Sequence, residues 1–320
     1  MPSPYSSGPT SNFILSDSVN INALLSEQLK IWGSGSSAET DVTYSFPRTS
    51  IPTAFWGLIY LEEEGAGPNA EYIFGFNSTQ IQAARDAFLA WENVANVNFV
   101  EIAESSSSVG DIRLAFSSDV SDEFWGFAYL PDRGPEAGDI WVNTSLASDA
   151  DWSPGTYNYS SLVHEIGHSL GLKHPFEGLI NLPTNLDAVN YTVMAYIEPK
   201  NVNYRDQSQN QTIYTIQNPM VYDILAIQYL YGENTSYRTG DDVYLYDPSQ
   251  PFYETIWDAG GIDTIDLSLF VTDNVIDLFD GSYSSISFPD WIGSDNLGIA
   301  FNTIIENAIG GSGNDTIIGN

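Results

Sequence analysis

Several residue types and segments that define whole classes of protein are missing from this 320-residue chain. It has no cysteine, which excludes disulfide bonds, thiolate zinc sites and cysteine nucleophiles. No apolar run approaches the roughly 18 residues that a membrane-spanning helix needs. The first residues lack the basic start and the apolar core of a signal peptide, so no N-terminal export signal is expected.

Positive charge is also scarce. Nine lysines and arginines stand against 42 aspartates and glutamates, so the formal net charge is −33. Such a surface repels phosphate backbones and anionic lipid, and we expect neither a nucleic acid nor a membrane as a partner. The excess of carboxylates has two compatible interpretations: solubility in a salty environment, and binding of calcium, which prefers hard oxygen ligands.

Apolar periodicity divides the chain into three parts. Residues 1–40 are rich in serine, glycine and proline, with one short helical pattern at 21–31, and are predicted to form an N-terminal arm outside the core. A central part carries helical and strand patterns, and after about residue 232 short β-prone segments alternate with Gly/Asp-rich turns. The predicted strands are 41–46, 97–101, 111–116 and 139–142, and the predicted helices are 79–95 (capped by Ser78 or Thr79), one from about 160, and 220–231.

The three histidines of the chain all lie in one segment that reads H-E-x-x-H-x-x-G-x-x-H. Residues four apart share a helix face, so His164 and His168 can direct two imidazoles at one cation. Gly171 can take a positive φ and end the helix, after which the chain turns back to deliver His174. Glu165 is placed to accept a proton from a water on the metal. A bare HExxH occurs by chance on ordinary helices, but the eleven-residue form favours a zinc site.

This pattern resembles the metzincin zinc metalloproteases, and further residues resemble their serralysin branch. Met194, in YTVMAY, is similar to the Met-turn beneath the metal, although a lone methionine can also be core filler. Pro175 follows the third histidine and Tyr196 lies two residues after Met194, as in serralysins. The resemblance implies that Tyr196 is an additional zinc ligand at rest, which swings away on substrate binding and stabilises the oxyanion. It extends to VTYSF (42–46), AWENVANVNF (90–99), GDIWVN (138–143) and PMVYDILAIQYLYGEN (219–234), and covers most of residues 40–320.

The resemblance implies an α+β fold in two domains. Residues 41–234 are expected to form a metzincin catalytic domain, with a twisted, mainly parallel sheet, long helices and a zinc cleft. Residues 235–320 are expected to form a mostly-β calcium-binding domain of the parallel β-roll or sandwich type, in a truncated form. The GDIWVN segment is either the edge strand that aligns an extended peptide or a buried structural strand.

The C-terminal part contains one copy of the G-G-x-G-x-D-x-U-x nonapeptide of calcium-binding β-rolls, in which Gly311, Gly313 and Asp315 would serve calcium. One copy does not make a stable roll, and a simple Gly/Asp turn is the alternative. The serralysin resemblance implies a further calcium set, with Ile304 offering its carbonyl. Its members are Arg238, Gly240, Asp242, Asp258, Gly260, Gly261, Asp263, Ile304 and Glu306. Asp242 replaces the usual threonine, and the stretch between Arg238 and Asp258 is shorter than usual.

The expected function is that of a secreted zinc endopeptidase acting on extended polypeptides, with Glu165 as general base and with zinc and Tyr196 sharing the negative charge of the transition state. One catalytic zinc and one or more structural calcium ions are implied. The family also implies a monomer, type I-like export, and room for a proteinaceous inhibitor as a partner. Two alternatives stay open: a catalytically silent calcium-dependent binding or structural module of the same fold, and zinc hydrolysis of a non-peptide substrate. Residues 1–20 are also compatible with a propeptide remnant that blocks the cleft.

Overall fold

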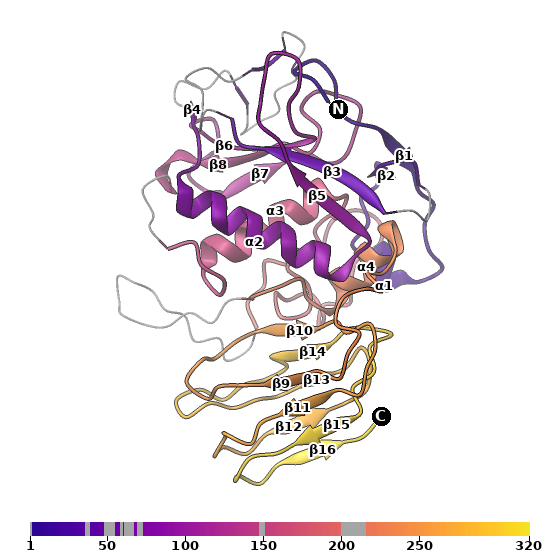
Figure 1. Ribbon diagram of the computed structural model, residues 1–320, viewed down its shortest axis with the longest axis vertical. Helices are drawn as coiled ribbons and strands as arrows, with labels where there is room; N and C mark the ends of the chain where they lie inside the picture. Colours follow the sequence, from indigo (N-terminus) through magenta and orange to yellow (C-terminus); the bar gives the residue numbers. More distant parts are fainter. Residues whose placement is uncertain are drawn as a thin grey trace.

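The computed structural model describes residues 2–35, 39–47, 55–57, 60, 67–68, 73–146, 151–199 and 216–320. These residues form two regions stacked along the long axis of the molecule (Figure 1). The upper region in that view contains the helices and a mixed sheet, and the lower region contains the short strands that follow residue 232. None of the helices in the described part of the chain is long and apolar enough to cross a membrane.

The upper region is built on a twisted sheet with the strand order β5-β3-β6-β8-β7. Strands β3, β5, β6 and β8 pair in parallel, whereas β7 is antiparallel to β8 and β4 is antiparallel to β6. The bounds are β3 Thr40–Ser45, β4 Ile73–Phe74, β5 Val97–Glu101, β6 Ile112–Ser117, β7 Gly126–Ala128 and β8 Ile140–Asn143, followed by a 3₁₀ turn at Thr144–Leu146. The expected α+β architecture with a mainly parallel sheet is therefore confirmed.

Strand β8, which contains most of the GDIWVN segment, lies inside this sheet and not at its edge. All four of its residues are buried, and it pairs with β6 on one side and β7 on the other. The edge-strand alternative for this segment is therefore wrong, and the buried alternative is observed. The outer position belongs to β7, whose three residues were too few to give a strand pattern in the sequence.

Two helices pack side by side below the sheet in Figure 1, α2 (Ser78–Val94) and α3 (Tyr157–Ser169). The apolar side chains of α2 at helical spacing, among them Phe88 and Trp91, are buried, as the periodicity predicts. The predicted cap at Ser78 or Thr79 is wrong. Asn77 is the cap instead, because its side-chain oxygen accepts hydrogen bonds from the backbone N–H groups of Thr79 and Gln80.

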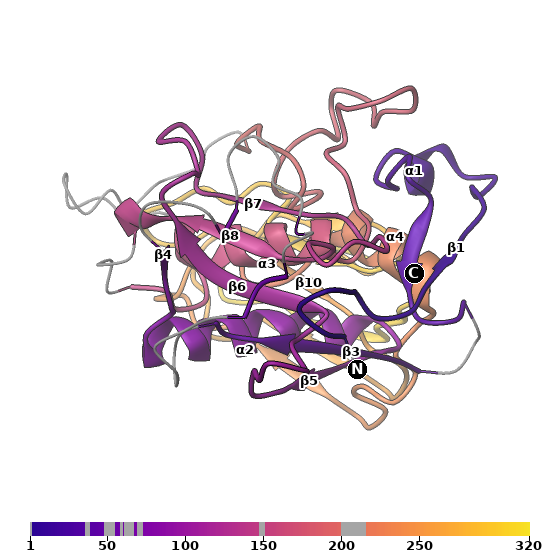
Figure 2. The same cartoon turned by 90° about the horizontal axis from the view of Figure 1, so that it is seen from above.

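The N-terminal part belongs to the core, so the predicted arm outside the core is wrong. Its elements are β1 (Thr10–Asn12), α1 (Val19–Asn22) and β2 (Lys30–Trp32), and only the first few residues of the pattern at 21–31 are helical. Leu24, Leu25 and Trp32 are at most 1% exposed. The Trp32 indole donates a 2.7 Å hydrogen bond to the carbonyl of Ser169 at the end of α3. Figure 2 shows α1 beside α4 (Val221–Tyr231), the last helix of the region.

The lower region is a stack of short, mainly parallel strands. Strand β11 lies between β9 and β15, β10 pairs with β14, and β12 pairs with β16, all in parallel, while β13 is antiparallel to β14. Alternate residues such as Tyr244, Ile265 and Ile276 point into the stack and are buried. The strands are β9 Val243–Leu245, β10 Glu254–Ile256, β11 Thr264–Asp266, β12 Val275–Asp277, β13 Tyr283–Ser284, β14 Leu297–Ile299, β15 Asn307–Ile309 and β16 Thr316–Ile318. This arrangement agrees with the expected parallel β-roll.

Candidate metal centre

Helix α3 places two imidazoles side by side. Its N-terminus is capped by Thr156, whose hydroxyl accepts from the backbone N–H of Tyr159. His164 and His168 lie one turn apart, and their Nε2 atoms are 3.1 Å from each other. The helix ends at Ser169, and Gly171 follows with a φ of +107°, a backbone conformation that residues other than glycine rarely adopt.

The chain turns back after Gly171 and brings in the third imidazole. The Nε2 atom of His174 lies 3.2 Å from that of His164 and 3.0 Å from that of His168. Three nitrogens bound to one zinc ion at 2.0–2.1 Å and at tetrahedral angles would be about 3.4 Å apart. The three Nε2 atoms are therefore close to the spacing that a shared zinc ion requires.

The other ring nitrogen of each helix histidine is held by a backbone carbonyl. His164 Nδ1 is 2.7 Å from the oxygen of Val193, and His168 Nδ1 is 2.9 Å from the oxygen of Leu172. A carbonyl can only accept, so Nδ1 carries the proton and Nε2 keeps its lone pair. Lone pairs that face one another cannot hydrogen-bond, and a cation between them removes the conflict.

Burial keeps the imidazoles of His164 and His168 neutral, and the neutral imidazole is the form that binds a metal ion. Burial lowers the pKa of His164 to about 3 and that of His168 well below its usual value, with the neighbouring histidines adding to the fall in each case. In contrast, Nδ1 of His174 has a side chain as its neighbour and not a backbone carbonyl: it lies 2.8 Å from a carboxylate oxygen of Glu177.

Glu165 is buried next to the three imidazoles and lines both cavities that open beside them. Burial raises the pKa of its carboxyl group to about 8. It faces strand β7, since a Cβ built on Gly126 would be 3.6 Å from Glu165 Oε1. A carboxyl group at this position can exchange a proton with a molecule held between the histidines and β7.

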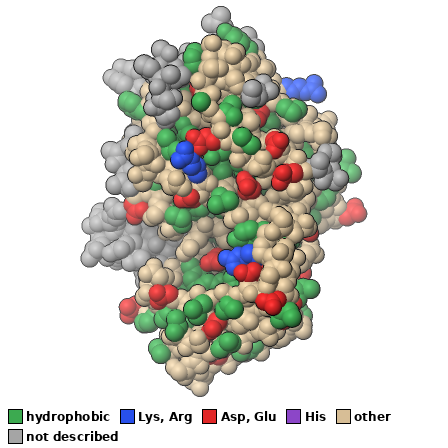
Figure 3. Space-filling model, in the orientation of Figure 1, with side chains coloured by type: hydrophobic (Ala, Val, Ile, Leu, Met, Phe, Trp, Pro, Cys, Tyr) green, Lys and Arg blue, Asp and Glu red, His purple; other side chains and the backbone are tan. Residues whose placement is uncertain are grey.

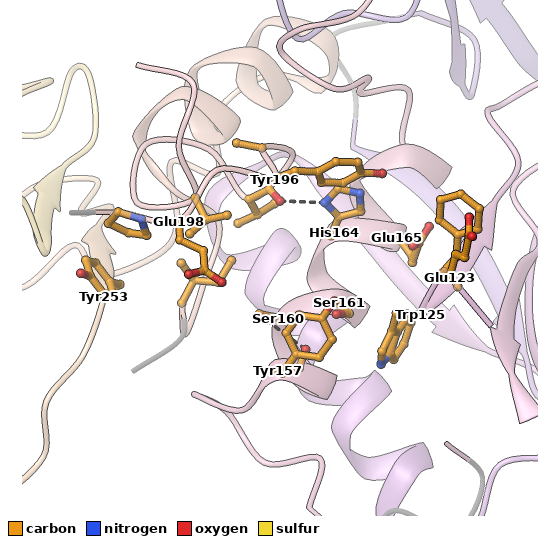
Figure 4. Close-up of a pocket in the computed structure, with 17 residues that line it drawn as sticks. Glu123, Trp125, Tyr157, Ser160, Ser161, His164, Glu165, Tyr196, Glu198 and Tyr253 are labelled. Atoms are coloured by element: carbon orange, nitrogen blue, oxygen red, sulfur yellow. Dashed lines mark hydrogen bonds between the residues drawn. The ribbon is translucent and has the colours of Figure 1, made fainter. Parts of the chain in front are cut away.

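The Tyr196 ring lies next to His164 (Figure 4). Its ring centroid is 4.6 Å from that of His174 and 5.8 Å from that of His164, and the residue is 59% exposed. Partial burial, with Glu165 nearby, raises the pKa of its phenol to about 12. The phenol therefore stays protonated at neutral pH and can donate a hydrogen bond.

Met194 lies beneath the metal centre, fully buried against α3. A Cβ on Gly167 would come within 2.6 Å of its sulfur, so the absence of a side chain at Gly167 makes room for the thioether. Asp223, at the start of α4, fixes the same loop: its carboxylate accepts from the Thr192 hydroxyl and from the N–H of Val193 at 2.6 and 2.7 Å. This role was not predicted from the sequence, where its signal was one acidic residue in a mostly apolar helix.

The cavities extend to either side of the histidines. One, of about 490 Å³, is drawn in Figure 4 and is lined by Trp125, Tyr157 and Glu198, and by Tyr253 of the lower region. The other, of about 810 Å³, runs along β7 past Phe127 and Tyr129. Residues 2–20 line neither cavity, and Pro2 instead accepts a hydrogen bond from the N–H of Val109. The position of this segment gives no support to the idea that it blocks the cleft.

A second group of metal-binding side chains lies in the lower region. Carboxylate oxygens of Asp242, Asp258 and Asp263 are all within 4.8 Å of one another. Asp258 and Asp263 are almost completely buried, and Asp263 Oδ2 has no hydrogen-bond partner. Burial raises the pKa of Asp263, and the nearby carboxylates, including Glu306, raise it further. A divalent cation would compensate these charges, so the donor set fits calcium.

The other expected members of this set lie around the three aspartates. Gly261 approaches Gly240 so closely that a Cβ would be 1.9 Å from the Gly240 oxygen, and Gly260 has a φ of +140°. Glu306 accepts from the N–H of Asp263 at 2.7 Å. Arg238, with a φ of +47°, places a guanidinium nitrogen 3.5 Å from Asp242.

Ile304 is 63% exposed, and no described hydrogen bond links its carbonyl to the aspartates. The structure therefore groups Asp242, Asp258 and Asp263 and places the other expected residues next to them, except Ile304, for which it gives no such contact.

The nonapeptide turn packs against an earlier turn of the stack. A Cβ on Gly311 or Gly313 would lie 2.2 Å from the oxygen of Phe270 or Thr272, respectively. Asp315 accepts from the N–H of Asn274, and Asp273 accepts from the N–H of Asn314 at 2.6 Å. Asp273 was missed in the sequence, because its turn, between 270 and 274, has no glycine to mark it.

The face shown in Figure 3 carries acidic side chains over both regions and basic ones at few points. No histidine side chain is visible on it. This face therefore has no basic patch of the kind that binds a nucleic acid or an anionic membrane.

Two protein-family models match consecutive parts of the chain. The model described as Matrixin matches residues 76–232, and the model described as Peptidase M10 serralysin C terminal matches residues 224–320. Together they run over the metal centre, α4 and the whole stack of short strands.

Individual relatives agree with the family models. The chain is 34% identical to a protein named Serralysin from Proteus mirabilis, over 88% of this chain and 59% of the relative. It is 34% identical to Serralysin C from Dickeya chrysanthemi, over 81% of this chain and 57% of the relative, and 36% identical to Metalloprotease AprA from Pseudomonas entomophila, over 77% of this chain and 54% of the relative. The chain thus spans somewhat more than half the length of these relatives. It belongs to the serralysin-type metzincins of peptidase family M10.

Proposed function

We propose that the chain is a zinc-dependent endopeptidase in which His164, His168 and His174 hold the catalytic zinc, with Tyr196 as an additional ligand at rest. The observation that carries this proposal is the convergence of three Nε2 atoms within 3.0–3.2 Å of one another, each on a ring that burial or packing holds in place. The names of the relatives, serralysin and metalloprotease, support the reaction class.

The bound zinc would acidify a water and polarise the scissile carbonyl. The remaining steps belong to side chains. Glu165 accepts the proton of the attacking water and later delivers it to the leaving amine. Tyr196 donates its phenolic hydrogen to the developing oxyanion, for which its exposed position beside His174 leaves it free to move. Met194 and Gly171 are structural, one as the floor of the site and the other as the turn that returns His174.

Strand β7 offers the backbone edge on which a peptide can lie. The backbone N–H of Tyr129 donates to the Asp139 carbonyl, and the Trp125 carbonyl accepts from the backbone N–H of Asn143. The backbone groups of these odd-numbered residues therefore point toward β8. Since the direction of backbone groups alternates along an antiparallel strand, Gly126 and Ala128 present theirs on the opposite side. An extended peptide pairing there would pass directly in front of Glu165.

We further propose that the aspartate group binds structural calcium. Arg238, Gly240, Gly260, Gly261 and Ile304 would contribute at or near their carbonyls, and Asp242, Asp258, Asp263 and Glu306 through carboxylates. The unpartnered Oδ2 of buried Asp263 supports this site. Gly311, Gly313 and Asp315 would form a second calcium position, opposite the turn that contains Asp273.

The remaining expectations are kept as proposals. Residues 41–234 would be the catalytic domain and 235–320 the calcium-binding domain. The protein would act outside the cell as a monomer on extended polypeptides, after type I-like export, with a proteinaceous inhibitor as a further partner and without binding nucleic acid or membranes. The absence of nucleic acid and membrane as partners rests on the net charge of −33, and the domain bounds rest on the change of pattern after residue 232 together with the family. The other expectations rest on the family.

Casein hydrolysis by the wild type and by Glu165→Ala tests the proposal. We expect Glu165→Ala to lower kcat/KM by about 10²–10⁴-fold while it retains zinc, because it removes the proton acceptor and no metal ligand. Removal of zinc with 1,10-phenanthroline should abolish hydrolysis in the wild type. Glu39→Ala, at an exposed carboxylate, is the matched control and should keep full activity. Equal hydrolysis by Glu165→Ala and the wild type would end the assigned mechanism, and zinc binding without any hydrolysis would favour a catalytically silent module.

A further inference from the structure

The turn that carries the third histidine contains a buried cation. Lys173 is 8% exposed, and its Nζ lies 2.5 Å from the backbone oxygen of Glu177, 2.6 Å from that of Ala23, 3.1 Å from that of Ile180 and 3.3 Å from that of His174. We call these four oxygens the carbonyl cage. A neutral amine has only two N–H donors and would turn its lone pair toward an oxygen, so the cage calls for the ammonium form with three donors.

The carbonyl cage joins two segments that are far apart in the sequence. Ala23 follows α1, whereas the other three oxygens belong to the turn at residues 174–180. Two backbone hydrogen bonds run beside the cage, from Lys173 N to the Leu24 oxygen at 2.8 Å and from Ser26 N to the Gly171 oxygen at 2.9 Å. The chain has no cysteine, so these two segments cannot be joined by a disulfide, and the Lys173 ammonium joins them through hydrogen bonds instead.

The same turn determines where the third imidazole lies. His164 and His168 are fixed by α3, but His174 lies outside any helix or strand. Within the turn, the Phe176 ring lies parallel to the His174 ring, with centroids 5.1 Å apart, and Glu177 Oε1 is 2.8 Å from His174 Nδ1. The carbonyl cage includes the backbone oxygens of both His174 and Glu177. Displacing the ammonium would therefore release the ring and its carboxylate partner together.

We propose that Lys173 is a positioning residue for the third metal ligand, whose ammonium holds the turn at 174–180 against the N-terminal segment so that His174 meets the two helix histidines. This inference rests on the proposed zinc site. Lys173 also lines the larger cavity, but its N–H donors are directed into the carbonyl cage, so it is assigned no contact with substrate.

The test compares zinc affinity in the full-length wild type, Lys173→Met and Arg85→Met, by competition with a chromophoric chelator under conditions where each protein is folded. Lys173→Met keeps the apolar stem and removes the ammonium. Arg85→Met removes a positive charge from a surface ion pair with Glu101 and is the matched control. We expect Lys173→Met to raise the Kd for zinc about 10–100-fold, as is typical when a group that orients a ligand is lost, and Arg85→Met to stay within about twofold of the wild type. In the cobalt-substituted protein, Lys173→Met should also change the d–d absorption spectrum, which a uniform loss of stability would leave unaltered.

Chemical rescue separates positioning from stability. Lys173→Ala lacks the equivalent of propylammonium, and adding propylammonium should restore most of the lost zinc affinity. Tetramethylammonium at the same concentration has no N–H donor and should not. If Lys173→Met does not fold, Lys173→Gln, which keeps two N–H donors without the charge, takes its place in the affinity measurement.

The outcomes distinguish this inference from the zinc site on which it depends. Tight zinc binding by the wild type with an unchanged Kd and cobalt spectrum in the lysine variants overturns the role of Lys173 and leaves the metal centre intact. Equal rescue by propylammonium and tetramethylammonium also overturns it. Failure of the wild type to bind zinc overturns both proposals.

Discussion

Two candidate metal sites in the described part of the chain, the histidine site and the site of Asp242, Asp258 and Asp263, are built from opposite kinds of ligand. In the upper region, three imidazoles converge, and burial keeps the two helix imidazoles neutral while backbone carbonyls hold their Nδ1 atoms. In the lower region, three aspartates converge with Glu306 nearby, and buried Asp263 has an unpartnered oxygen. Neutral ligands can be brought together by the protein core alone. Carboxylates repel one another and become stable together only when protons or a cation compensate them.

This difference assigns different tasks to the two metals. The three histidines lie on a framework of α3, the turn after Gly171 and the N-terminal segment, so zinc bound there would supply chemistry more than stability. The proposed calcium ligands lie on turns between the short strands of the lower region. Calcium bound there would compensate the carboxylates and so contribute directly to folding.

The largest expected effect is that of calcium removal. Chelation with EGTA should unfold the lower region and lower the free energy of unfolding by about 5 kcal/mol, since each of two sites contributes roughly 2.7 kcal/mol when calcium is at 100 times its Kd. Removing zinc alone should leave the circular dichroism spectrum unchanged. Calorimetry with each chelator measures both effects, and equal losses of stability would contradict the difference drawn between the sites.

The next effect is a pH dependence in the zinc-free protein. The pKa of Glu165 is about 8 in the folded state and near 4.5 when exposed, so between these pH values the folded state holds one more proton than the unfolded state. The free energy of unfolding should therefore fall as pH rises through this window, by at most about 1.4 kcal/mol per pH unit.

Glu165→Gln cannot titrate and is the control for that measurement. The pH dependence of urea unfolding, taken as the difference between wild type and Glu165→Gln, isolates the carboxyl group from the histidines that both proteins share. A difference that does not vary between pH 5 and 8 would show that this carboxyl group is not buried as described.

Asp223 sharpens the contrast, because it is a buried carboxylate that hydrogen bonds satisfy without a cation. Its oxygens accept from Thr192 Oγ1, Val193 N and Met220 N at 2.6–2.8 Å. Asp223→Ala should lower the free energy of unfolding by about 3 kcal/mol, since two buried N–H groups lose their acceptor. Asp223→Asn, which keeps one carbonyl oxygen, should lose less. Urea denaturation in excess calcium checks this, and a loss that disappears when calcium is removed would contradict it.

The smallest effect has opposite signs with and without calcium. Asp263→Asn should stabilise the calcium-free protein by about 1 kcal/mol, because one of several facing charges is removed. The same change should weaken calcium binding. Thermal melts across a calcium titration should show the two curves crossing. A variant that is less stable at every calcium concentration would mean that the carboxylate is compensated within the protein.

Elements with a strong local pattern were predictable from the sequence. Strand β5 has the predicted bounds, and α2 differs from the prediction by one residue at each end, because Phe88 and Trp91 mark its buried face. The H-E-x-x-H-x-x-G-x-x-H segment gave the three histidines, Glu165 and the turn at Gly171 in one pattern. Here the residues that define the site are close together in the chain, so local spacing carries the information.

The rest depends on contacts between distant segments. Leu24, Leu25 and Trp32 are buried because residues 169–173 lie against them, which a Ser/Gly/Pro-rich stretch does not reveal. Strand β7 has three residues and no periodicity. Asp273 lies in a turn without the glycines of the nonapeptide, and the role of Lys173 depends on Ala23, 150 positions away.

X-ray absorption at the zinc edge of the purified protein tests the central claim most directly. The account predicts one zinc per chain, coordinated by three imidazole nitrogens at about 2.0–2.1 Å and completed by oxygen, with no sulfur. A spectrum with fewer than three imidazoles, or a protein that takes up no zinc, would contradict it.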